Sequence, residues 1–419
     1  MGSLYFKQAL ANLRENPQVT LLTVTGTALS VAMMLVLVLV CQVRTASFPP
    51  VSERHRILYI PIIQGLNKDR AGFSGGGLGY RIVRDCFYPM SLPEAVSAAS
   101  SEVLQKHTAV PGNKTVRETD VKETDANFWK LFDFRFLDGK PFTEEMFASA
   151  MPVAVISDRV AREFFGTTAA AGRTIRLDFV EYSVTGVVAS VSKAVEEAYG
   201  EVWTPYSLNG EIMKGDIAEG IGGKLQVFLL GKSPAGFDAI RQEAHSRIAT
   251  FNEGQREFFA HIWKQPVTGT QRMFYHIQED RLHGNASGMF SLAALFLFLP
   301  VFNLLGIMSV RIRKRASEIG IRKAFGATAW DMTGQILAEN LPVTFLGGLA
   351  GLLLSVLFFY LAKDGLLERT DVNLQPAMII KPALFAGAVL TCLLINLLST
   401  ALPAWRISKE TVIRNLSQK

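Results

Sequence analysis

An uncharged stretch near the N-terminus, residues 19–43, constrains this chain more than any other feature. A membrane-spanning helix needs roughly 20 mostly apolar residues, and a charge at its centre costs about 2.5 to 3.5 kcal/mol. Three later stretches pass the same test, at 284–310, 335–362 and 382–405. The sequence therefore predicts a membrane protein with four transmembrane α-helices.

A cleaved signal peptide is the alternative interpretation of the first stretch, because Lys7 and Arg14 precede it. Its apolar part is too long for a signal peptide and no A-x-A cleavage site follows, so we expect the helix at 19–43 to be retained. Residues 1–18 have apolar side chains at helical spacing. They predict a cytoplasmic helix in the membrane interface, with an ordinary solvated tail as the alternative.

The positive charges set the expected orientation, since cytoplasmic segments next to membrane helices are enriched in Lys and Arg. With both termini inside, the segments 1–18, 311–340 and 404–419 hold 12 Lys and Arg against 5 Asp and Glu, a net +7. The rest of the chain holds 31 against 32. The net positive charge of the chain therefore comes from the predicted cytoplasmic segments. It indicates orientation in the membrane and gives no support to nucleic-acid binding.

Residues 44–283 read as one large extracytoplasmic domain. Its only cysteine is Cys86, because Cys41 and Cys392 fall in predicted spans, so a disulfide framework is excluded. Strands and helices alternate in it without a regular period, which predicts an α+β domain. The expected elements are strands at 57–63, 152–157, 225–231 and 273–278, a glycine-rich loop or hairpin at 73–81, a hairpin at 174–191, and helices at 91–106, 158–166 and 233–251.

Motifs for catalysis are missing from the sequence. Gly231-Lys232-Ser233 ends like a phosphate-binding loop, but the position of its first glycine holds Gln226. The histidines have no metal-ligand spacing and no G-x-S-x-G elbow is present, so we expect neither a metal nor a cofactor in this chain. The sequence predicts a chain that is not an enzyme.

Several small or polar residues inside the predicted spans are candidates for helix packing. Gly347 and Gly351 form a G-x-x-x-G pair, and Gly26 with Ser30 is a second small pair. Asn303 and Asn396 would not be satisfied by lipid, so we expect them to face other helices. Packing within one subunit and packing across a dimer both remain open.

The predicted cytoplasmic segment 311–334 carries the strongest functional signal. It starts with the basic run RIRKR, Gly326 is placed to end a helix, and Thr328 with Asp331 fits a capping box for the next one. These features predict a short helix around 318–325 at the membrane surface. A short helix at this position is suited to be moved by a bound partner protein.

At SEIGIRKAFGAT the sequence resembles the MacB/FtsX-type permease family, whose members carry the signature E-I-G-[IL]-R-[KR]-A-x-G-A after the second of four membrane helices. The runs ANFWKLFDFRFLDGKPFTEE and LPAWRISKETVIRNL resemble family motifs too, with Lys140 and Thr411 as departures. The signature implies an ATPase-coupling role, with positive and apolar contacts for a groove on the ATPase. Its residues here are Glu318, Ile319, Gly320, Ile321, Arg322, Lys323, Ala324, Phe325, Gly326 and Ala327.

The resemblance implies a permease subunit of a type VII ABC transporter in the bacterial inner membrane. A separate ATPase chain would bind ATP and Mg²⁺, and a second permease copy or a paralogue would complete a dimer. The outer domain would have a porter-like lobe around a sabre-like lobe near 112–210. A short loop at 363–381 and a cytoplasmic tail at 406–419 complete the expected topology.

Efflux of small amphiphiles, drugs or peptides from the periplasm is the leading functional expectation, with a membrane-fusion protein and an outer-membrane channel as further partners. An FtsX-like regulator of cell-wall hydrolases is an alternative, although its outer domain is typically smaller. Lipoprotein release of the LolC/LolE kind is another, since it shares four helices and a large outer domain.

Overall fold

The computed structural model describes residues 17–45, 47, 49–67, 72–112, 115–193, 195–215, 217–272, 321, 325–326, 328–366, 386–387, 390 and 394. The chain divides into two compact units. One unit is Met1–Val43, Gly284–Leu366 and Leu374–Lys419, and the other is Arg44–His283 with Leu367–Asn373.

The second unit is built on a mixed sheet that has fifteen strands among the described residues. The strands that come first and last in the unit form what we name the terminal half of this sheet. They are β1 (Ile57–Ile60), β2 (Ile63–Leu66), β3 (Gly72–Leu78), β4 (Ala95–Ser100), β12 (Gly222–Gly223), β13 (Leu225–Leu230), β14 (Phe259–His261) and β15 (Val267–Thr268).

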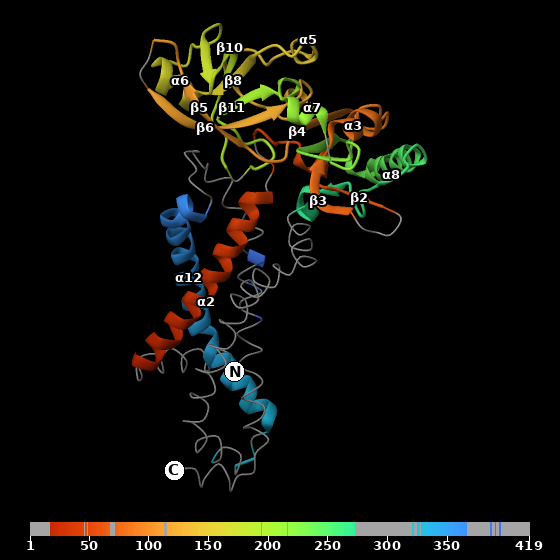
Figure 1. The fold of residues 1–419 in the computed structure, drawn as a ribbon. Coiled ribbons are helices and arrows are strands. Elements are labelled where there is room, and N and C mark those ends of the chain that lie inside the picture. The colour runs from red at the N-terminus through yellow and green to blue at the C-terminus, as the bar shows by residue number, and fades with distance from the viewer. Residues whose placement is uncertain are drawn as a thin grey trace. The chain divides into compact units, whose positions relative to one another are not determined.

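The strands between them in sequence form the central half. They are β5 (Leu104–Ala109), β6 (Val116–Thr124), β7 (Phe136–Gly139), β8 (Val153–Ser157), β9 (Thr174–Leu177), β10 (Val180–Val188) and β11 (Val202–Pro205). Figure 1 shows β5, β6, β8, β10 and β11 gathered on one side of the unit, and β2 and β3 on the other. The porter-like lobe and the sabre-like lobe expected near 112–210 stay a prediction.

The order of the strands shows how the two halves meet. Along the main path it is β11-β8-β10-β9-β5-β6-β4-β13-β3-β2-β14. The β4–β6 step is a single antiparallel register pair, Ala99 with Thr124, whereas all six residues of β5 pair with β6. Because so few ladder bonds cross this step, the contact between the halves depends on side chains.

Aromatic side chains provide much of that contact. The run NFWKLFDF begins α4 (Phe128–Leu131), and Trp129 lies edge-on to Phe142 and Trp203 in the central half. From α4 the packing continues through Phe132 to Phe228 in β13, with ring centroids 5.2 Å apart. Buried aromatic rings contribute large apolar areas. This chain of rings joins the two halves through the middle of the unit.

The second unit also has six α-helices among its described residues, of which α8 is the longest. They are α3 (Tyr80–Ile82), which continues into a π-helical turn at Val83–Phe87, and α4, α5 (Glu144–Ala148), α6 (Asp158–Phe165), α7 (Gly210–Lys214) and α8 (Phe237–Glu253). The helix expected at 158–166 is confirmed. Ser157 caps it through the Val160 N–H, and Gly166 ends it with a left-handed φ of 72°. Glycine suits that position because it has no Cβ to clash.

The strands expected at 152–157 and 225–231 and the hairpin at 174–191 are confirmed as β8, β13 and β9–β10. The stretch expected as one strand at 57–63 is broken into β1 and the start of β2. The glycine-rich run forms β3, which pairs antiparallel with β2, so the hairpin alternative is right. The strand expected at 273–278 lies outside the described residues.

The helix expected at 91–106 is wrong. Residues 95–100 form β4, which pairs with β13 along its whole length, and β5 begins at Leu104. Alanine favours helices in isolation, but this segment lies inside a sheet, where Val96 to Ser100 are all buried. Packing overrides a weak local preference here.

In the first unit the structure describes two long helices, α2 (Pro17–Thr45) and α12 (Ala329–Leu366). Pro17 stands at the start of α2, where proline is tolerated, and Pro342 lies inside α12. Within the described residues, one helical window is both long and apolar enough to cross a membrane, Thr344–Leu361, and the apolar stretch Val24–Val36 of α2 is shorter. The predicted spans 284–310 and 382–405 fall almost wholly outside those residues, and four spans stay a prediction.

Candidate functional site

The two glycines predicted for helix packing lie at a close contact between α12 and α2. A Cβ atom at Gly347 would be 2.6 Å from the Thr27 Cβ, and one at Gly351 would be 2.6 Å from the Ala28 carbonyl oxygen. Real Cβ atoms do not approach that closely, so each site needs glycine. Ser355, one turn further on, is fully buried as well. A stripe of small residues thus lets the two backbones approach each other.

The other small pair takes a different position. The nearest atoms of α2 to the two glycines belong to Val24, Thr27, Ala28 and Val31, so Gly26 and Ser30 are beside this contact. The Ser30 hydroxyl donates to the Gly26 carbonyl at 2.7 Å, which satisfies it within its own helix. Asn303 and Asn396 lie outside the described residues.

The segment before α12 is described in part. Ile321 is helical, and the Phe325 N–H donates to its carbonyl at 3.3 Å. Gly326 has a φ of 92°, a left-handed value that suits glycine after the last turn of a helix. The side chains of Ile321 and Phe325, four residues apart, are 51% and 89% exposed. Two apolar side chains one hydrogen-bonded turn apart therefore lie open to a partner.

The remaining signature residues lie outside the described residues, and their coupling role stays a prediction. They are Glu318, Ile319, Gly320, Arg322, Lys323, Ala324 and Ala327.

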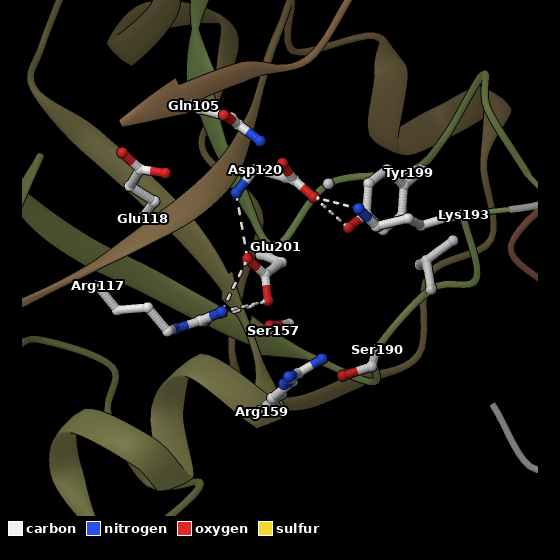
Figure 2. A pocket seen from close by; sticks show the side chains of 12 residues that line it. Gln105, Arg117, Glu118, Asp120, Ser157, Arg159, Ser190, Lys193, Tyr199 and Glu201 are labelled. Atoms are coloured by element: carbon white, nitrogen blue, oxygen red, sulfur yellow. Dashed lines mark hydrogen bonds and ion pairs between the residues drawn. The ribbon is translucent and has the colours of Figure 1, made fainter. Parts of the chain in front are cut away.

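A polar pocket of about 260 Å³ lies in the central half of the second unit (Figure 2). Its wall comes from β5, β6, the end of β8, the start of α6 and the loop 189–201. The labelled residues are Gln105, Arg117, Glu118, Asp120, Ser157, Arg159, Ser190, Lys193, Tyr199 and Glu201. Sequence reasoning did not find this pocket, because its residues are brought together only by the folded sheet.

The charges of this pocket neutralise one another. Arg117 forms an ion pair with Glu201 at 3.1 Å, and Lys193 lies 3.0 Å from Asp120. Burial acts to raise the pKa of Asp120, but hydrogen bonds from Tyr199 and Lys193 hold this pKa below its ordinary value. These paired charges stabilise the loop 189–201 against β6.

The serine hydroxyls of the wall have structural partners. Ser157 caps α6, and the Ser190 hydroxyl donates to Asp158 at 2.6 Å. No group of three or more His, Cys, Asp or Glu side chains is arranged for a metal ion within the described residues.

A buried carboxylate, Asp125, is a second site that sequence reasoning missed. It accepts hydrogen bonds from Tyr88 and Ser97 at 2.7 Å each and from the backbone of Ala98 and Phe128. Burial raises the pKa of Asp125 to about 6, while these hydrogen bonds act in the opposite direction. Its bond from the Phe128 N–H is local, but the N-cap position of α4 is Asn127, so the sequence carried no capping signal at Asp125. Asp125 connects the terminal and central halves.

Two family models match the chain in sequence order. The MacB-like periplasmic core domain matches residues 20–246, and the FtsX-like permease C-terminal model matches residues 290–412. The first match alone covers 227 of the 419 residues, more than half of the chain.

Curated relatives cover much of the chain. The macrolide export ATP-binding/permease protein MacB of Wolinella succinogenes is 27% identical over 361 residues, 84% of this chain and 52% of that protein. The uncharacterized ABC transporter permease YknZ of Bacillus subtilis is 23% identical over 301 residues, 71% of this chain and 70% of that protein. This chain spans about half the length, or less, of the MacB and pyoverdine-export relatives that it matches.

Among solved structures, the periplasmic region of MacB from Actinobacillus actinomycetemcomitans matches 53% of this chain and 92% of its own, with 14% identity and a TM-score of 0.36. Family membership depends instead on the two ordered matches at 20–246 and 290–412. By those matches the chain belongs to the MacB/FtsX-type permease family of ABC transporters, membrane permeases with a large extracytoplasmic domain.

Proposed function

We propose that this chain is the permease subunit of a type VII ABC exporter. It spans the inner membrane four times with both termini in the cytoplasm, and it couples ATP hydrolysis on a separate ATPase chain to movement of the extracytoplasmic domain. ATP and Mg²⁺ bind to that ATPase and not to this chain. The observation that carries the proposal is the ordered pair of family matches, the periplasmic core domain first and the permease segment second.

The exposed pair Ile321 and Phe325 supports a docking role for the segment before α12. Both side chains are apolar and more than half exposed, and Gly326, directly after Phe325, has a left-handed φ. Covering an apolar side chain with a partner favours binding by roughly 25 cal/mol for each Å² removed from water. A groove on the ATPase that takes both side chains would thus gain affinity from them.

Replacing both side chains by aspartate tests this docking. We expect Ile321→Asp with Phe325→Asp to abolish co-purification of the ATPase, because two charges would have to enter an apolar groove. The sequence-based pair Glu318→Lys with Gly320→Trp should act in the same way. The measurement is the amount of ATPase that co-purifies with the detergent-extracted chain.

Phe179 offers a matched control, since it is 97% exposed at a hairpin turn of the central half. Phe179→Asp should leave ATPase co-purification and the amount of chain in the membrane unchanged. ATPase that co-purifies with the Ile321→Asp, Phe325→Asp variant at the wild-type level would refute the docking site.

For the cargo we propose small amphiphiles, drugs or peptides taken from the periplasm. Macrolide and pyoverdine export are named for its relatives, and this chain covers only part of their length. A dimer of two permeases, a membrane-fusion protein and an outer-membrane channel complete the proposed pathway. Expression with the ATPase in an efflux-deficient strain should raise resistance to a macrolide, and no change for any amphiphile would instead favour an FtsX-like or lipoprotein-release role.

A further inference from the structure

A buried cluster of charges joins the two ends of the extracytoplasmic unit. Arg54 lies nine residues after the end of α2 at Thr45, and Arg272 is the last residue described before the predicted second span. The Arg54 Nη2 atom lies 2.9 Å from one Glu197 carboxylate oxygen, and the Arg272 Nη1 atom lies 3.9 Å from the other. The side chains of Arg54, Glu197 and Arg272 are only 9%, 5% and 12% exposed.

The two chain ends already lie side by side in the sheet. β1, the first strand after α2, pairs antiparallel with β15, the last described strand, through Leu58 with Thr268 and Tyr59 with Val267. Tyr59 also enters the cluster, because its hydroxyl donates to Glu197 at 3.5 Å and the Arg272 guanidinium lies over its ring at 5.2 Å. The entering and leaving strands thus form one ribbon.

Glu197 belongs to the other half of the unit. It lies in the loop 189–201 between β10 and β11, and this loop is anchored to the central half at several points. The Trp203 indole donates to the Ala198 carbonyl at 3.1 Å, and the buried Lys122 of β6 donates to the Glu196 carbonyl at 3.4 Å. Displacement of Glu197 therefore displaces the loop and β6 together.

A merely stabilising role explains this cluster poorly. Burial of ions is costly in free energy, and apolar residues of similar size in their place are often equally stable or better. What a buried ion cluster adds is a defined mutual position of its members, since removal of one partner leaves an uncompensated charge. The position defined here is that of the membrane-connecting ribbon against the central half.

We propose that Glu197 is a positioning residue that ties the β1–β15 ribbon to the central half, so that a displacement of the membrane connections is passed to the strands β5–β11. This inference rests on the proposed function, in which the ATPase moves the membrane helices. The ladder between the halves is a single register pair, so side-chain links between the halves, this cluster among them, must carry that displacement.

The test uses the chain in nanodiscs with its co-purifying ATPase. Hydrogen exchange is measured over α2, α12 and residues 104–205, with and without ATP plus vanadate. One variant replaces the cluster by apolar residues, Arg54→Met with Glu197→Leu and Arg272→Met, which keeps the volume. A second variant, Glu197→Gln, keeps the shape and removes the charge, in case the first one does not fold.

A matched control removes an ion pair that lies outside the cluster. Glu211 and Lys224 form an exposed pair, 75% and 59% exposed, in the same unit. Glu211→Leu with Lys224→Met should behave like wild type, and the thermal midpoint of each variant reports whether it is folded.

In wild type we expect nucleotide to change exchange in α2, α12 and residues 104–205. In the folded cluster variants the change in α2 and α12 should remain and the change in 104–205 should be lost. A change in 104–205 that persists in these variants, or that is absent from wild type while α2 and α12 respond, overturns the inference alone. A wild-type complex in which α2 and α12 do not respond overturns the proposed function and the inference with it.

Discussion

At the scale of single residues, Lys122 is a fully buried amine with a strongly shifted pKa. Its side chain is buried in β6, and burial together with the nearby Arg272 lowers the pKa of Lys122 from 10.5 to about 7, although Glu197 and Glu196 act to raise it. Between pH 7 and 10 the folded chain thus binds fewer protons here than the unfolded chain. The free energy of unfolding should rise with pH across this window.

The substitution Lys122→Met tests the sign of this pH dependence of the free energy of unfolding. We expect the wild-type free energy of unfolding to gain at most about 4 kcal/mol from this residue between pH 7 and pH 10, and the variant to lose this gain. Urea unfolding of the detergent-solubilised chain, followed by tryptophan fluorescence, measures it. The exposed Lys224→Met should keep the wild-type slope, and the same slope in Lys122→Met would refute the assignment.

At the scale of elements, the α2–α12 contact gives a matched pair of substitutions. A methyl group at Gly351 would meet the Ala28 carbonyl oxygen at 2.6 Å, whereas nothing lies within 4 Å of one at the neighbouring Gly348. Alanine is the better helix former at both positions by about 1 kcal/mol. The two sites therefore differ only in the space around them.

We expect Gly351→Ala to destabilise the helix pair by about 1 to 3 kcal/mol, the usual cost of overpacking, and Gly348→Ala to be neutral or stabilising. Thermal unfolding midpoints in detergent micelles compare the two variants. Equal midpoints would mean that α2 and α12 do not pack through this stripe.

At the same scale, the predictions from sequence were right where the local signals agreed with the packing. The helix α6 has a capping Ser157 and a closing Gly166, and β8 and β13 are short apolar runs. The prediction failed at β4, where an Ala/Ser-rich segment has no local signal for a strand. Its neighbour β13, far away in sequence, decides its conformation.

At the scale of the whole extracytoplasmic unit, Asp125 and its donors join the two halves. Tyr88→Phe removes one hydrogen bond from this buried carboxylate, and we expect a loss of about 1 to 3 kcal/mol in the free energy of unfolding. Because the halves form one compact unit, the loss should appear in a single transition. Coincident unfolding curves from fluorescence and circular dichroism check this, and two separate transitions would contradict it.

Local patterns were enough to predict long apolar helices on either side of a large α+β region and a resemblance to the permease family, because hydrophobic runs and short motifs lie in consecutive residues. Which distant residues meet became clear only in the folded chain. Gly351 packs against Ala28, Tyr88 donates a hydrogen bond to Asp125, and Glu197 forms ion pairs with Arg54 and Arg272. The physical reason is that sheet pairing and helix packing bring residues together across long sequence separations, where no local pattern records the partner.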